Sequence, residues 1–166
     1  MQIQCLNYTT FLQRHGIGLV AAVHNFTAST FLCDNRTNNI KLLPMQDEFI
    51  VFDTETTGLY PHLGDVIIEI AALRINKDGH VLAEFQKFVN SGIPSHPETI
   101  KIHGLTDEFI AKHGLPPKQV FPEFVEFAGS TTLVGHNIRD FDMKFLNRHL
   151  VQIGLPPSEN DLIDTL

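Results

Sequence analysis

Two long apolar runs followed by a tight turn constrain the fold of this chain more than any other feature. Residues 48–54 (EFIVFDT) and 66–75 (VIIEIAALRI) each predict a strand bounded by turn signals. Asp78-Gly79 then predicts a hairpin into a third strand, residues 80–89. The sequence therefore predicts a sheet that begins with three consecutive strands.

The residues after this hairpin alternate between helical and extended patterns. Gly92, Pro94 and Pro97 predict a loop. The order of the remaining segments predicts an α/β fold, a mixed sheet with helices on its faces. These segments are a short helix at 106–112 with Thr106 as N-cap, a helix from Pro116-Pro117 to Gly129, a strand at 131–135 and a helix at 140–153.

Composition limits the setting and the kind of partner. The 166 residues are 43% hydrophobic and carry a net charge of −7, which argues against DNA binding driven mainly by phosphate neutralisation. Cys5 and Cys33 have no metal-binding spacing, so a reducing, cytoplasmic setting is expected. The apolar run at 17–23 is too short to cross a bilayer, so no membrane partner is expected.

The chain divides into two regions of different character. Residues 1–47 show no clean periodicity and predict an N-terminal extension of unknown role, whereas residues 48–166 predict the folded domain. Met45 lies just before the regular pattern, which makes a start of translation at Met45 an alternative expectation.

Acidic residues at the ends of predicted elements are the candidate metal ligands. Asp53 and Glu55 lie two apart at the end of the first strand, so both carboxylates point to one face. Asp142 lies on the last helix beside its apolar face, where an unpaired charge is costly. Mg²⁺ and similar ions prefer oxygen ligands and would relieve the repulsion between these acids.

Other polar residues have simpler interpretations. Glu69, inside the second strand, is expected to be a buried acid held by local hydrogen bonds. His136-Asn137 are expected to hold the loop before the last helix rather than to bind metal. His103 is expected to lie in a loop. Asp142 has a second explanation, because an acid in the first turn of a helix is stabilised by the helix dipole.

Three segments together resemble the DEDD-family 3′→5′ exonucleases, and closely the epsilon (proofreading) subunits of bacterial DNA polymerase III. The segments are FIVFDTETTGL (49–59) followed by GDVIIEIAALRI, PETIKIHGLTDEFI (97–110), and LVGHNIRDFDMKFL (133–146). The resemblance implies a ribonuclease-H-like fold and hydrolysis of single-stranded DNA from its 3′ ends with two ions, Mg²⁺ or Mn²⁺. The resemblance implies a DNA polymerase subunit as a candidate partner. It favours DNA over RNA as the substrate.

The resemblance also assigns roles to individual positions. Asp53, Glu55 and Asp142 match catalytic metal ligands, with Asp140 as a competitor to Asp142. Five residues match substrate-contacting positions: Thr56, Thr57, Leu59, Glu98 and His103.

A third family motif, a histidine shortly before a last aspartate, has no match in this sequence. Asp161 and Asp164 come too early for it. The fold is therefore expected to lack its C-terminal part, and the metal site to be incomplete. The alternative to an exonuclease is a catalytically impaired fragment, or a non-catalytic module that binds DNA ends or a polymerase.

Overall fold

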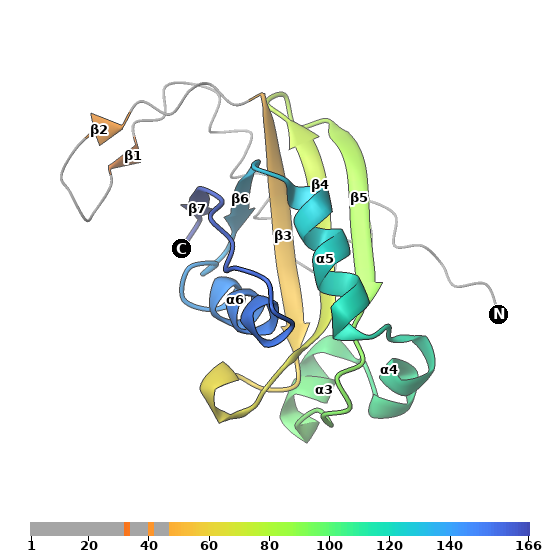
Figure 1. Ribbon diagram of the computed structural model, residues 1–166. Helices are drawn as coiled ribbons and strands as arrows, with labels where there is room; N and C mark the ends of the chain where they lie inside the picture. Colours follow the sequence, from red (N-terminus) through yellow and green to blue (C-terminus); the bar gives the residue numbers. More distant parts are fainter. Residues whose placement is uncertain (1–31, 34–39, 42–46) are drawn as a thin grey trace.

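A five-stranded mixed sheet forms the centre of the computed structural model, which describes residues 32–33, 40–41 and 47–166 (Figure 1). The strand order is β5-β4-β3-β6-β7, with β3, β4 and β5 antiparallel and β6 and β7 parallel to β3. The strands are β3 (Glu48–Thr56), β4 (Ile67–Asn76), β5 (Val81–Phe88), β6 (Thr132–Gly135) and β7 (Leu162–Asp164). The predicted mixed sheet is confirmed, with β3 at its centre.

Five helical segments connect these strands. They are the 3₁₀ helix η2 (Pro61–Leu63) and the α-helices α3 (Pro97–His103), α4 (Asp107–His113), α5 (Pro117–Ala128) and α6 (Asp142–Gln152). Separately, β1 (Leu32–Cys33) and β2 (Ile40–Lys41) pair antiparallel. Among the residues described, no helix combines the length and apolar character needed to cross a membrane.

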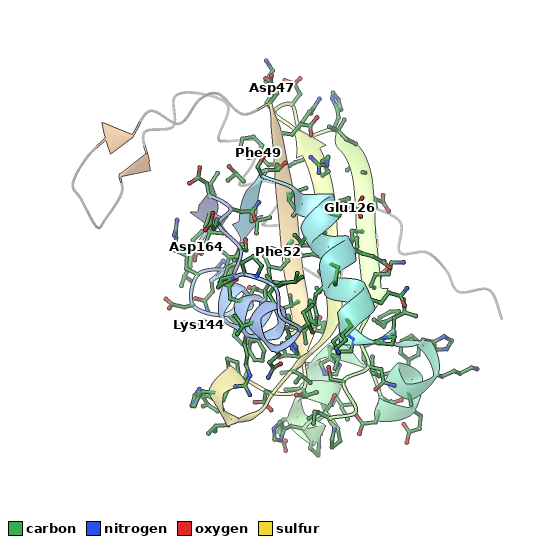
Figure 2. The ribbon with its side chains drawn as sticks, viewed as in Figure 1. Asp47, Phe49, Phe52, Glu126, Lys144 and Asp164 are labelled. Atoms are coloured by element: carbon green, nitrogen blue, oxygen red, sulfur yellow. The ribbon has the colours of Figure 1, made fainter. Side chains whose placement is uncertain are left out.

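Helices α5 and α6 cover one face of the sheet (Figure 1). Phe52 points from β3 toward them (Figure 2), and its ring centroid lies 5.3 Å from that of Phe124 on α5. Val51, one residue before it, belongs to a second buried cluster with Leu73 and Val134, to which none of the described helices contributes a residue. Successive side chains of β3 thus enter two buried clusters on opposite faces of the sheet, which explains why β3 is apolar on both faces.

His149 joins α6 to β4. Its Nε2 accepts a hydrogen bond from the backbone N–H of Ile67 at 3.0 Å, and its ring stacks on Phe121 at 4.5 Å. Burial, helped by the charge of Arg148, lowers the pKa of His149 to about 4. A neutral imidazole therefore fixes α6 against the strand next to β3.

The N-cap prediction at Thr106 is confirmed. Its side-chain oxygen accepts a hydrogen bond from the backbone N–H of Phe109 at 3.2 Å, at the start of α4. Gly129 likewise ends α5, with a φ of 54° that favours glycine.

Two expectations about helix positions were wrong. His103 is the last residue of α3 rather than part of a loop, because Pro97 is well suited to the first helical position and Gly104 ends the helix with a φ of 73°. Helix α6 begins at Asp142 rather than at 140, because the chain first turns at Asn137, whose φ is 56°. The sequence also left 161–166 unassigned, and three of these residues form β7.

Candidate active site

The central strand β3 carries the first two acids. Asp53 and Glu55 are both half-buried, and they lie near the end of β3, opposite Ala71 and Glu69 of β4. Both follow the buried run from Ile50 to Phe52, and β4 fixes their backbone on one side, whereas β6 pairs with β3 only from Phe49 to Val51. Period-two geometry sends both side chains to one face of the sheet, as the sequence predicts.

Asp142 is the first residue of α6 and is only 1% exposed. Its Oδ1 accepts a hydrogen bond from the hydroxyl of Thr54 at 2.6 Å, so the start of α6 lies against the C-terminal part of β3. Burial first, and then the negative charge of Asp53, raise the pKa of Asp142 to about 8. Hydrogen bonds from Thr54 and from backbone N–H groups act in the opposite direction.

The pairing of Asp142 with Asp53 has a chemical consequence. A buried carboxylate whose pKa is raised by burial and by a neighbouring carboxylate forms a site that a proton or a cation stabilises. Hard divalent ions take oxygen ligands of this kind. The donor set formed by Asp53 and Asp142 therefore fits Mg²⁺ or Mn²⁺, with Glu55 two residues along the same strand.

The described residues do not, however, form a complete metal cage. Within 47–166, no group of three His, Cys, Asp or Glu side chains is gathered closely enough to hold an ion. The expected third ligand, Glu55, shares the strand but is not drawn into such a group with the other two acids.

Asp140 differs from Asp142 in its exposure, its hydrogen-bond partner and the direction of its pKa shift. Its side chain is 76% exposed and accepts a hydrogen bond from Lys144 one helical turn later at 2.8 Å. That bond and the positive charge of Lys144 lower the pKa of Asp140. Figure 2 shows Lys144 projecting from α6. Of the two acids, only Asp142 lies against Thr54 and Asp53.

Glu69 is completely buried beside this site. It pairs with Glu55 across β3 and β4, so the two side chains share a face. The side-chain amide of Gln86 donates a hydrogen bond to Glu69 Oε1 at 2.6 Å. This agrees with the interpretation of Glu69 as a buried acid held by local hydrogen bonds.

A tight loop follows the acids, and Asp65 holds it together. The Asp65 carboxylate accepts hydrogen bonds from Tyr60 N–H at 2.8 Å and from the Thr57 hydroxyl at 3.5 Å, and it pairs with His96 Nε2 at 3.0 Å. Gly58 packs directly against this carboxylate, where a Cβ would overlap it. The hydroxyl of Thr56 donates to Gly58 O at 2.6 Å. Thr56 and Thr57 are thus buried parts of the turn.

The other three expected substrate positions differ in exposure. Leu59 is 58% exposed, and Glu98 is exposed in the first turn of α3. His103 is buried, and its Nδ1 accepts a hydrogen bond from Leu105 N–H at 2.9 Å. Only Leu59 and Glu98 are therefore open to a ligand at the surface.

The residues His136 and Asn137 support the chain before α6. His136 Nδ1 lies 3.3 Å from the Thr165 hydroxyl, and Asn137 O accepts hydrogen bonds from the N–H groups of Asp140 and Phe141. These contacts agree with the structural role expected for both residues.

Sequence reasoning missed Thr54 and Asp65, although both had a signal. Thr54 lies between two acids on a strand, so period-two geometry already sends it to the opposite face. Asp65 precedes an apolar strand without a neighbouring cation in the sequence, which marks an acid that needs hydrogen-bond donors.

The chain is similar in sequence to proteins of known family. Residues 50–166 match the RNase T family model, described as exonuclease. PolC-type DNA polymerase III of Streptococcus pneumoniae is 39% identical over 129 residues, covering 78% of this chain and 8% of that polymerase. The PolC-type enzyme of Halalkalibacterium halodurans is 37% identical over 156 residues, covering 93% of this chain and 10% of the polymerase. The chain thus spans about a tenth of these relatives or less.

Solved structures show the same fold. E. coli exonuclease I in complex with a dT13 oligonucleotide superposes with a TM-score of 0.66 and 19% identity, covering 72% of this chain and 28% of that one. Its zinc-bound form in complex with single-stranded DNA gives a TM-score of 0.67 and 20% identity, covering 73% and 28%. The expected ribonuclease-H-like fold is therefore confirmed, and the chain belongs to the RNase T exonuclease family.

Proposed function

We propose that this chain is a metal-dependent 3′→5′ exonuclease domain that hydrolyses single-stranded DNA ends, of the proofreading type. The observation that carries the proposal is the buried carboxylate of Asp142 beside Asp53 at the end of the central strand. Buried acids that repel each other are costly to fold, and catalysis is the common reason to retain them.

In this proposal the three acids hold the ions and the neighbouring surface holds the DNA. Asp53, Glu55 and Asp142 bind Mg²⁺ or Mn²⁺, and bound ions of this kind activate water and stabilise the charge that develops on phosphate oxygens. The exposed side chains of Leu59 and Glu98 contact the terminal nucleotide. Thr56, Thr57 and His103 act through the shape of the turns they hold.

The relatives support the choice of substrate and setting. The exonuclease I complex contains a dT13 oligonucleotide, and the PolC-type relatives are DNA polymerases. By analogy, we propose single-stranded DNA as substrate, a polymerase as the partner and the cytoplasm as the location. We also propose that residues 48–166 form the exonuclease domain and residues 1–47 an extension.

A second candidate function is a non-catalytic module that binds DNA ends or a polymerase. The lack of a three-ligand group among residues 47–166 favours it. Only the first candidate predicts release of nucleotides, whereas the second predicts binding, to DNA ends or to a polymerase, without release.

The test is nucleotide release from oligonucleotides labelled at either end, with Mg²⁺ or Mn²⁺. We expect the 3′ label to be released first from a single strand, more slowly from a duplex, and not at all after Asp53→Asn. A phosphorothioate bond at the 3′ end slows release if the expected polarity holds. Binding of the oligonucleotide without any release, at either end and with either ion, would support the non-catalytic module instead.

A further inference from the structure

Thr54 occupies an unusual place between the two acids of β3. Because side chains alternate along a strand, Thr54 points to the face opposite Asp53 and Glu55. That face is the one covered by α5 and α6, and Thr54 is buried there. Strand β6 pairs with β3 only from Phe49 to Val51, so the start of α6 meets the edge of β3 beyond that point, where Asp142 contacts the Thr54 hydroxyl and also feels the charge of Asp53.

The Thr54 hydroxyl makes one short contact across this boundary. It donates to Asp142 Oδ1 at 2.6 Å, and the two residues lie 88 positions apart in the sequence. Hydrogen bonds from a hydroxyl to a carboxylate are short and stronger than neutral ones. The bond therefore links the first residue of α6 directly to the strand that carries the other two acids.

The orientation of Asp142 depends on this link. Backbone N–H groups also bond to this carboxylate, and the Thr54 hydroxyl is the side-chain donor that holds its Oδ1. Oδ2 then has a fixed direction relative to β3. Partners behind a ligand act in this way in metal sites, and removing one typically weakens metal affinity or activity by about 10–100-fold.

We propose that Thr54 is a positioning residue: its hydroxyl orients the Asp142 carboxylate so that Asp142 and Asp53 bind one divalent cation together. The inference rests on the proposed function for the role of the acids. It adds a fourth residue to the site, one that touches neither the ion nor the DNA.

Substitution of Thr54 separates this role from simple packing. Thr54→Val keeps the branched shape and removes only the hydroxyl, whereas Thr54→Ser keeps the hydroxyl and removes a methyl group. Thr132→Val is the matched control, since Thr132 is a buried threonine on the neighbouring strand β6. All are made in the full chain and checked for folding by circular dichroism.

The readout is Mn²⁺ affinity measured by titration calorimetry, without DNA. We expect Thr54→Val to weaken binding at least about tenfold. Thr54→Ser should stay close to wild type, and Thr132→Val should match it. Wild-type affinity in Thr54→Val, an equal loss in the serine and valine variants, or no Mn²⁺ binding by the wild-type chain would overturn the proposal.

A double-mutant cycle guards against an indirect effect on folding. If Thr54 acts through Asp142, then Thr54→Val should weaken Mn²⁺ binding no further once Asp142→Asn is present. An undiminished loss in that background would place the effect elsewhere and contradict the proposal. A wild-type chain that binds Mn²⁺ but releases no nucleotide would end the exonuclease proposal, while the ratio of affinities would still decide the role of Thr54.

Discussion

Asp142 shows at the scale of one residue that the fold places a carboxylate where its negative charge is unfavourable. The α6 N-terminus and the Thr54 hydroxyl favour its charged form, but burial and Asp53 oppose that form more strongly. The folded protein without metal therefore favours a proton on Asp142 up to about pH 8. Stability should report that preference directly.

The stability of the metal-free protein should depend on the charge of Asp142. Its folded pKa, about 8, lies above the ordinary value of 3.8. Between these two values the unfolded chain has lost the proton that the folded chain keeps, so the contribution of Asp142 to stability declines as pH rises from about 4 to about 8. Urea denaturation in EDTA should show the stability of Asp142→Asn gaining on wild type across this window. A constant difference between the two proteins would refute the assignment.

His149 should act in the opposite direction over a lower pH range. Its folded pKa, about 4, lies below the ordinary 6.5, so its contribution is complete above about pH 6.5 and is lost as pH falls toward 4. His149→Phe keeps a ring on Phe121 but leaves the buried Ile67 N–H without its acceptor, which costs about 1–3 kcal/mol. That cost, measured by urea denaturation, should shrink as pH falls below 6. A cost that does not change with pH would mean that folding does not lower the pKa of His149, which would contradict the buried neutral imidazole.

At the scale of elements, the loop between β3 and β4 shapes the candidate site together with the strands. It follows Thr56, the last residue of β3, and the Asp65 carboxylate accepts hydrogen bonds from the Tyr60 N–H and the Thr57 hydroxyl within it. The guanidinium of Arg148 on α6 also donates to Pro61 O, so the loop is held from the helix side as well. These hydrogen bonds hold the loop in a conformation in which Leu59 is exposed.

Gly58 should tolerate no side chain while Asp65 is present. Gly58→Ala places a methyl group against the Asp65 carboxylate and forces it away from Tyr60 N–H and the Thr57 hydroxyl. We expect a loss of about 1–3 kcal/mol in the free energy of unfolding. In an Asp65→Ala background the same change should cost clearly less, because the crowded atoms are gone. Equal costs in both backgrounds would show that crowding against Asp65 is not the cause.

The elements that sequence could predict are those with a local signal. The apolar runs and the Asp78-Gly79 turn specify β3, β4 and β5, and Thr106 and Gly129 mark helix ends. Helix α3 and strand β7 are short, and β7 gains its partner only when it meets β6, 29 residues earlier in the chain. Period two predicts the shared face of Asp53 and Glu55, but the burial of Asp142 and the exposure of Asp140 depend on how α6 packs.

At the scale of the whole molecule, the net charge of −7 and the carboxylate pair both make cations stabilising. A ligand that binds only the folded state at 100 times its dissociation constant adds about 2.7 kcal/mol. We therefore expect saturating Mn²⁺ to raise the melting temperature of the wild type by several degrees at constant ionic strength. Asp53→Asn should lose this rise and Asp140→Asn should keep it. A rise that persists in Asp53→Asn would reflect general screening of charge.

The central claim is that the buried acid Asp142, and not its exposed neighbour Asp140, belongs to a hydrolytic metal site. The most direct measurement is the rate at which the 3′-terminal nucleotide leaves a labelled single strand in Mn²⁺, for wild type, Asp142→Asn and Asp140→Asn. Both substitutions remove one carboxylate charge from the same stretch of chain. We expect Asp140→Asn to release nucleotide at nearly the wild-type rate and Asp142→Asn to release none above background. Equal rates in the two variants, or a loss confined to Asp140→Asn, would contradict the account.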